Sequence, residues 1–177
     1  VSTASYVLQI NEAKNIIEAD VKVQKKEYDS SNSLPAYTIF YNENNLTENK
    51  DYIAITASIN VTSSAKLYII GIGEYVGQKV VEFEITKAKL TIEELEVKNR
   101  FANGTTTIEV SGGKLKGIKG NDTISLEEIK GNVESANVGE GKKVSVSAEL
   151  IGEIDVIQNY ILEEPNVAVT ISRPTIT

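Results

Sequence analysis

The sequence predicts an all-β protein made of two β-sandwich domains in tandem. Three observations support this prediction. Apolar and polar residues alternate over short stretches, turn-forming residues separate these stretches, and a short pattern recurs at long intervals. Alternation with a period of two indicates strands that bury one face, and many short strands between turns are typical of a sandwich.

The recurring pattern indicates two similar units laid head to tail. It reads LQINEAK at residues 8–14, FEITKAK at residues 83–89 and VTISRPT at residues 169–175. Its spacing is close to the length of a small β-sandwich domain. We therefore expect a chain cut from a longer tandem array.

This pattern also sets the expected domain boundaries. Residues 13–88 form the first sandwich and residues 89–177 the second, while residues 1–12 are the closing strand of an absent preceding repeat or an N-terminal edge strand. We expect the strand that ends at Ile85 to pass through residues 86–89 into the next strand. A connection this short and without glycine limits rotation between the two domains.

Alternating apolar rows mark the strands expected to form the two cores. Side chains two residues apart lie on the same face of a strand, so each row is expected to face the interior. Two rows lie in the first unit and two in the second: Ile53, Ile55, Ala57, Ile59 and Val61; Val81, Phe83 and Ile85; Val144, Val146, Ala148 and Leu150; Val167, Val169 and Ile171.

Residues that favour turns separate these rows. Glycine and asparagine tolerate the backbone angles that tight turns need, and serine bonds its own backbone there. A short helical turn is the alternative for residues 125–133, although Gly131 limits it. Turns are expected at residues 42–45, 63–64, 71–73, 103–104, 112–113, 120–122 and 139–141.

Composition excludes several classes of function. The chain has 18 Lys and Arg against 25 Asp and Glu, a net charge of −7, so it lacks the basic face that nucleic-acid binding needs. It has no histidine and no cysteine, which excludes Ser-His-Asp triads, Cys-His dyads, imidazole or thiolate zinc sites and disulfides. No apolar run is long enough to span a membrane as a helix.

The second unit resembles the YDG-type repeat of bacterial surface proteins over residues 90–171. The repeat is named for a Tyr-Asp-Gly triplet, which here reads Phe101-Ala102-Asn103-Gly104 and so keeps the aromatic residue and the turn glycine. The matching stretches follow the family's order. They are NRFANGTT at residues 99–106, which contains this segment, LKG at 115–117, GND at 120–122, NVGEGKKV at 137–144 and NYIL at 159–162.

The first unit is similar to a bacterial immunoglobulin-like repeat of Gram-positive surface proteins over residues 13–87. The matching marks are Tyr28-Asp29, Pro35, Tyr41-Asn42, Asp51-Tyr52, GIGEYVG at residues 71–77 and FEI at residues 83–85. Both resemblances imply tandem immunoglobulin-like β-sandwiches from exported adhesins or cell-wall proteins. They imply an extracellular or cell-surface location, with signal and anchor outside this sequence, and no family-wide catalytic residue or cofactor.

The residues shared with these repeats are interpreted as structural. Gly104 is expected to supply the positive φ of a tight turn, and Tyr75 and Tyr160 are expected to bury their rings with the hydroxyl bonded to backbone. The structural motif residues are Tyr28, Tyr52, Gly73, Tyr75, Phe101, Gly104, Gly139, Asn159 and Tyr160.

Acidic clusters are the remaining candidates for catalysis, because two carboxylates suffice for glycoside cleavage. They lie at Glu93, Glu94 and Glu96, at Glu127 and Glu128, and at Glu163 and Glu164. Neighbouring residues on a strand point to opposite faces, so these glutamates are interpreted as solvated edges.

Ligand sites are weakly indicated. Asp and Asn gather at turns such as residues 42–51 and 121–122, but no calcium-loop motif is present. The Gly71-Ile72-Gly73 run lacks the pattern of a phosphate loop. Tyr37 and Tyr41 share one strand face and are candidates for a sugar platform, although core packing is the favoured interpretation.

Two classes of function stay open. The first is a non-catalytic spacer, a monomer whose partners are the neighbouring repeats of its own chain. The second is a binding module that recognises a glycan or host protein through sandwich-end loops or an edge strand. We expect no cofactor and no enzymatic activity, with a self-catalysed Lys–Asn isopeptide bond as the one exception considered.

Overall fold

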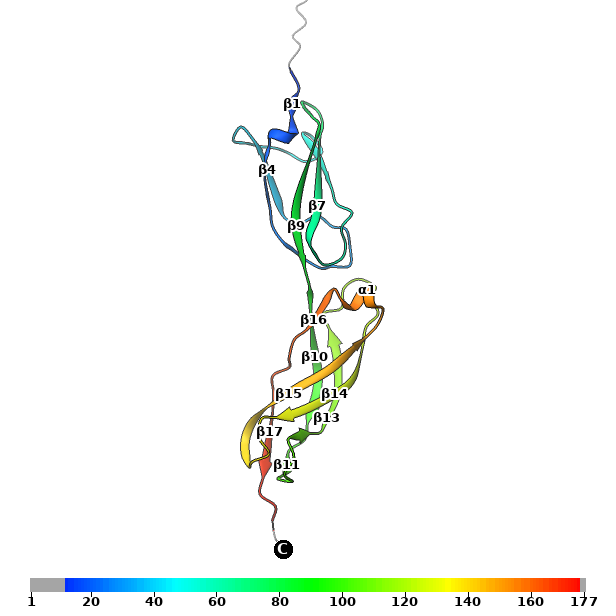
Figure 1. Ribbon diagram of the computed structural model, residues 1–177. Helices are drawn as coiled ribbons and strands as arrows, with labels where there is room; N and C mark the ends of the chain where they lie inside the picture. The colour runs from blue at the N-terminus through cyan, green and yellow to red at the C-terminus, as the bar shows by residue number, and fades with distance from the viewer. Residues whose placement is uncertain (1–11, 176–177) are drawn as a thin grey trace, which may run out of the picture. The chain divides into compact units, whose positions relative to one another are not determined.

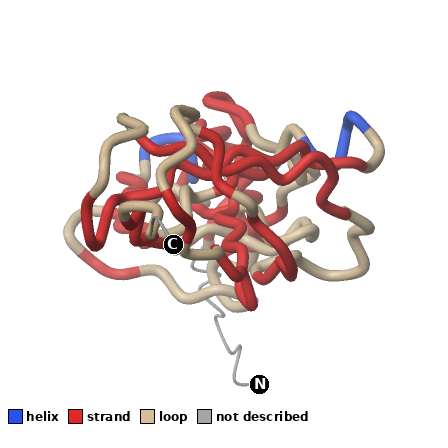
Figure 2. The backbone as a smooth tube through the Cα atoms, turned by 90° about the horizontal axis from the view of Figure 1, so that it is seen from below, coloured by secondary structure: helices blue, strands red, loops and turns tan. Residues whose placement is uncertain are grey.

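The computed structural model describes residues 12–175 and shows an all-β protein. Strands account for 57% of it and helices for 4% (Figures 1 and 2). Two compact units are present among the described residues: unit 1 comprises residues 12–26, Asn32–Ser58 and Thr62–Ile85. Unit 2 comprises Glu27–Ser31, Ile59–Val61 and residues 86–175. The strand expected over residues 1–12 lies outside the described residues, apart from Glu12.

The N-terminal half contributes three sheets, in which β1 pairs with β8, β4 lies between β2 and β5, and the third has the order β3-β9-β7-β6. The core of unit 1 includes the fully buried Ile16, Ile39, Leu67 and Ile69. The elements are β1 (Lys14–Asn15), η1 (Ile16–Glu18), β2 (Asp20–Val23), β3 (Lys26–Glu27), β4 (Tyr37–Tyr41), β5 (Asn44–Asn45), β6 (Tyr52–Ile55), β7 (Thr62–Gly71), β8 (Tyr75–Val76) and β9 (Gln78–Thr86).

The β4–β5 hairpin forms where the sequence predicts a turn. Tyr41 pairs with Asn44, which leaves a two-residue loop of Asn42 and Glu43. Both loop residues have positive φ, at 47° and 65°. Positive φ at both central positions is the type I′ geometry that matches the twist of paired strands.

The prediction that Ile53, Ile55 and Ile59 belong to a buried row is wrong, because these side chains face solvent. Ile55 is 51% exposed, whereas Tyr52 and Ala54 on the same strand are buried. The register explains this difference: Ala54 pairs with the inward Ile69, so the alternate positions point outward. The strand also stops at Ile55, so Ala57, Ile59 and Val61 do not continue the row.

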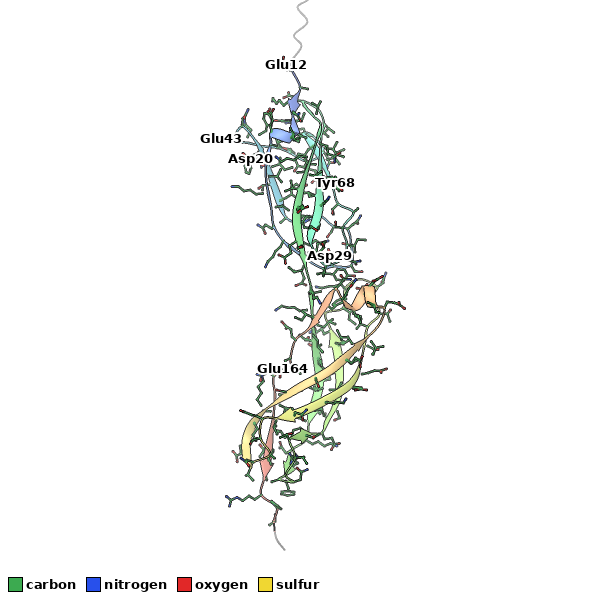
Figure 3. All side chains as sticks on the ribbon, in the orientation of Figure 1. Glu12, Asp20, Asp29, Glu43, Tyr68 and Glu164 are labelled. Atoms are coloured by element: carbon green, nitrogen blue, oxygen red, sulfur yellow. The ribbon has the colours of Figure 1, made fainter. Side chains whose placement is uncertain are left out.

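The outward row continues across the sheet. Ile55 on β6 pairs with Tyr68 on β7, which pairs with Val80 on β9. Tyr68 is labelled in Figure 3. The other row predicted for this unit is confirmed at Phe83 and Ile85, which are both buried.

In unit 2, β10 lies between β13 and β16, and a five-stranded sheet has the order β11-β17-β15-β14-β12. Its elements are β10 (Ala88–Val97), β11 (Arg100–Phe101), β12 (Thr107–Ile108), β13 (Val110–Lys116), β14 (Ser125–Val133), β15 (Gly139–Ile151), α1 (Ile154–Ile157), β16 (Tyr160–Leu162) and β17 (Val167–Ser172).

The core of unit 2 confirms both of its predicted rows. Val144 on β15 and Val169 and Ile171 on β17 are buried in one cluster with Ile108 and Val133. Val146 and Val167 pack against this cluster. Alternation predicts three of the five buried residues of this cluster, whereas Ile108 and Val133 lie outside the predicted rows.

Four local predictions are wrong because a strand continues through the expected interruption. The turn expected at residues 139–141 lies inside β15. Gly112 and Gly113 do not form a turn but lie inside β13, with φ of 73° and 103°. Residues 63–64 lie inside β7, and residues 125–133 form β14 rather than a helical turn. Bulges explain the cases in β7, β14 and β15, whose registers shift by one residue. Strand β13 keeps a regular register with β10 and accommodates its two glycines through their positive φ.

The chain passes between units as the sequence predicts. Strand β9 ends at Thr86 and β10 begins at Ala88, so Lys87 alone separates them. Among the described residues, no helix has the length and apolar character needed to cross a membrane.

Candidate functional site

A cluster of tyrosine, serine and aspartate side chains lies within unit 2. The hydroxyls of Tyr28 and Tyr160 both donate to Oδ2 of Asp122, at 2.9 and 2.6 Å. Ser30 Oγ donates to Oδ1 of the same side chain at 3.0 Å. Both carboxylate oxygens of Asp122 therefore accept hydrogen bonds from the protein, and we call these four residues with Asn159 the Asp122 cluster.

Tight turns place the members of the Asp122 cluster. Asp29 Oδ1 accepts from the backbone N–H of Ser31 at 3.0 Å, a local bond that shapes the segment carrying Tyr28 and Ser30. Gly120, with φ of 52°, begins the turn that presents Asp122. A Cβ on Gly120 would lie 2.9 Å from Ser30 Oγ, so these two turns meet at close range.

The two rings of the Asp122 cluster pack against each other. Tyr28 and Tyr160 meet edge to face, with centroids 5.4 Å apart and planes at 79°. Both rings are buried. The Tyr160 hydroxyl also accepts from the backbone N–H of Lys119 at 2.9 Å. Each tyrosine thus combines apolar burial with a satisfied polar end.

Asn159 is fully buried and uses both ends of its amide. Its Oδ1 accepts from the Val61 backbone N–H at 2.8 Å. Its Nδ2 donates to the Asp155 carbonyl at 2.7 Å and to Asn60 Oδ1 at 3.2 Å. A buried amide with every group bonded is a structural junction, because it has no donor left to offer a ligand.

The electrostatics of the Asp122 cluster favour protonated tyrosines. Burial raises the pKa of Tyr160, and its hydrogen bond to Asp122 raises the pKa further. Burial is also the main cause that raises the pKa of Tyr28. Phenols with raised pKa values serve as hydrogen-bond donors and are poor proton acceptors at neutral pH. The arrangement is suited to holding segments together.

The structure distributes the motif residues over both units. It brings Tyr28, Asn159 and Tyr160 together in unit 2. In unit 1, the buried Tyr52 packs 6.2 Å from Tyr37, and the buried Tyr75 packs 5.4 Å from Tyr41.

The remaining motif residues lie in turns or near the surface. Gly73 has φ of 63°, and Gly104 has φ of 79°, the positive angle expected of its turn. Gly139 begins β15. Phe101 is 59% exposed, so this aromatic of the motif is not a core residue.

Sequence reasoning missed the central role of Asp122. The sequence predicts a turn at Asp122 and makes it a candidate calcium ligand, whereas in the structure it accepts hydrogen bonds from the hydroxyls of two tyrosines. The available signal was an acidic residue in a turn, Asp122, together with two motif tyrosines, Tyr28 and Tyr160, that the sequence assigns to different units. Nothing in the spacing joins Tyr28 to Asp122, because their contact depends on the tertiary fold.

The acidic runs considered for catalysis form exposed ion pairs. Glu128 pairs with Lys130, and Glu163 pairs with Lys89, both at 2.6 Å. Glu93 likewise pairs with Lys116 at 2.7 Å. Within residues 12–175, no group of three or more acidic side chains is placed to hold a metal ion.

The tyrosines considered for a sugar platform are drawn into contacts in unit 1. The Tyr41 hydroxyl donates to Glu18 Oε2 at 3.0 Å, and its ring packs on Tyr75. Tyr37 packs on Tyr52. Both rings are half-buried and pack against neighbouring tyrosines outside the fully buried core.

Comparison with known proteins gives one family match, which covers part of the chain. The model of the YDG domain matches residues 86–168, which covers most of unit 2. The match supports the resemblance seen over residues 90–171. Neither the curated proteins nor the solved structures contain a significant match to this chain.

Proposed function

We propose that this chain is a non-catalytic spacer from a bacterial cell-surface or secreted repeat protein. In this proposal, two immunoglobulin-like β-sandwich modules follow each other, a bacterial immunoglobulin-like repeat and then the YDG domain. The supporting observation is the Asp122 cluster, whose carboxylate and buried amide are bonded within unit 2. Polar groups satisfied internally favour a structural role over ligand binding.

The connection between the modules is consistent with a spacer. Lys87 alone separates β9 from β10, and the connection contains no glycine. Short linkers without glycine have little conformational freedom. A protein that holds another domain away from a cell wall benefits from such connections, because each flexible joint would shorten the average reach.

Small-angle scattering of the intact chain tests the spacer function. A spacer must keep its two ends apart, so we expect an elongated particle. Inserting a flexible Gly-Ser linker after Lys87 should broaden the distribution of distances and leave the circular dichroism spectrum unchanged. A compact particle from the unmodified chain would contradict the proposal.

The expectation that this chain catalyses no reaction can be tested separately. Without histidine and cysteine, the reaction still open to this chain is a self-catalysed Lys–Asn isopeptide bond. Such a bond forms with loss of ammonia, which lowers the mass by about 17 Da. Intact mass spectrometry should give the mass calculated from the sequence, and a deficit of ammonia would refute the inert interpretation.

A binding module is the second candidate, and one surface favours it. Ile53, Ile55 and Val80 are exposed on the outward face of the β6–β7–β9 sheet. Exposed apolar patches often mark interaction sites. A screen of glycans and extracellular host proteins with the wild-type chain and Ile55→Ser would favour this function if binding were found and lost in the variant.

A further inference from the structure

Two strands early in residues 86–175 each run parallel to a strand near the end of the chain. Ala88, Lys89 and Leu90 of β10 pair with Tyr160, Ile161 and Leu162 of β16. Further along, Arg100 and Phe101 of β11 pair with Ile171 and Ser172 of β17. Both pairings are parallel, so the chain runs twice in the same direction along this track (Figure 1).

This register places the entry and exit of the chain at opposite ends of the track. Strand β10 begins at Ala88, which pairs with Tyr160, and β17 ends at Ser172, which pairs with Phe101. Tension applied to both ends of this stretch therefore pulls β10 and β11 toward the N-terminus and β16 and β17 toward the C-terminus. The hydrogen bonds within each of these two pairings are then loaded along the strands and strained together, rather than broken one after another.

We propose that these paired strands form a mechanical clamp that resists tension applied through the ends of unit 2. The clamp comprises residues 88–90 with 160–162 and residues 100–101 with 171–172. It follows from the register alone, whereas the idea that it carries tension in the native protein rests on the proposed spacer function.

Additional bonds close both segments of the clamp. At the first segment, Ala88 N–H donates to the Asn159 carbonyl at 2.9 Å, and Glu163 N–H donates to the Leu90 carbonyl at 2.8 Å. The Lys89 ammonium pairs with Glu163 at 2.6 Å across the same strands. These bonds extend the ladder beyond the paired residues, so more bonds share the strain.

At the second segment, a side chain fills the gap between β10 and β11. Asn99 lies between these strands, and its Oδ1 accepts from the Thr170 backbone N–H at 2.8 Å. Ala102 N–H donates to the Ser172 carbonyl at 2.9 Å. Asn99 thus supplies a hydrogen bond to β17 where the backbone of the first strand does not.

The Asp122 cluster anchors β16 against sliding along β10. Tyr160 is the first residue of β16 and is bonded to Asp122 and to the Lys119 backbone. Asn159 directly precedes it and is fully buried among its partners. Displacing β16 along β10 would break these bonds together with those of the ladder.

Single-molecule pulling of the intact chain tests the clamp. The sequence has no cysteine, so handles can be attached at introduced cysteines. One pair, Lys87→Cys with Arg173→Cys, loads the clamp along the strands. The other pair, Glu127→Cys with Glu149→Cys, pulls apart two exposed partners of the antiparallel β14–β15 ladder.

We expect the first pair to require a several-fold higher unfolding force than the second, because forced unfolding reflects the barrier crossed in each direction. Equal forces in the two directions would overturn the clamp. Adding Asn99→Ala should lower the force of the first pair and leave the second unchanged, whereas Asn137→Ala, an exposed asparagine in the same unit, should change neither.

An Asn99→Ala variant that unfolds at the wild-type force along the clamp would contradict the role of Asn99. These outcomes are separate from the spacer function. A compact particle in scattering would contradict the spacer function without affecting the evidence for the clamp. Equal unfolding forces in the two pulling directions would contradict the clamp even if the chain proved to be an elongated spacer.

Discussion

Tyr28 and Tyr160 meet edge to face, and their two hydroxyls donate to the same oxygen of Asp122. The contact joins a segment before residue 32 to the turn at residues 120–122 and to the start of β16. One carboxylate thus ties three stretches of unit 2 that are far apart in the sequence.

Replacing Asp122 by alanine should destabilise unit 2 strongly. The substitution leaves the hydroxyls of Tyr28 and Tyr160 without their acceptor, and each unsatisfied buried group costs about 1–3 kcal/mol. Chemical denaturation followed by circular dichroism measures the change in the free energy of unfolding. Asp155→Asn, an exposed side chain of the same unit, is the control and should be near neutral. Equal stability of the two variants would show that the cluster contributes nothing.

Alkaline pH should weaken the same cluster. The pKa values of Tyr28 and Tyr160 are raised in the folded state, so the unfolded chain loses these protons at lower pH than the folded chain. The stabilisation is complete below the ordinary tyrosine pKa of about 10 and declines as pH rises above it.

Tyr160→Phe should therefore flatten the decline of stability above pH 10, relative to wild type. Tyr68→Phe, on β7 of unit 1, controls for the loss of a tyrosine elsewhere. Thermal unfolding across the alkaline range gives both curves. An unchanged slope in Tyr160→Phe would show that this hydroxyl does not couple folding to pH.

Positive-φ glycines in unit 2 should differ sharply in their tolerance of alanine. Gly112 and Gly104 both have positive φ, which costs an alanine about 1–2 kcal/mol. A Cβ at Gly112 would also collide with the Glu94 carbonyl oxygen, whereas one at Gly104 meets nothing within 4 Å. Gly112→Ala should therefore be clearly more destabilising than Gly104→Ala in denaturant titrations, and similar costs would contradict this packing.

The sequence predicts the fold where burial follows strict alternation over long strands. Val144, Val169 and Ile171 are buried as predicted, because each lies on a strand with one solvent-exposed face and one buried face. The continuation of β13 through Gly112 and Gly113 was not predictable, because glycine pairs are typical of turns.

The Asp122 cluster was predictable only in its parts. Burial of the Tyr160 ring with a bonded hydroxyl follows from the chemistry of tyrosine. Its partners do not, because Asp122 and Tyr28 meet through the pairing of distant strands and turns. Sequence periodicity describes the faces of a strand and carries no information on which distant turn will lie beside it.

The failed prediction at β6 yields a sharp mutational comparison. Ile55 and Ile69 lie on neighbouring strands of one sheet, yet Ile55 faces outward and Ile69 is fully buried. Ile69→Ala should cost about 2–5 kcal/mol because it leaves a cavity in the core of unit 1. Ile55→Ala should cost much less and should reduce any self-association through the apolar sheet face. Denaturant titration measures the stability of both variants, and sedimentation velocity measures self-association. A large loss of stability in Ile55→Ala would contradict the outward orientation of Ile55 and favour the buried row that the alternation alone predicts.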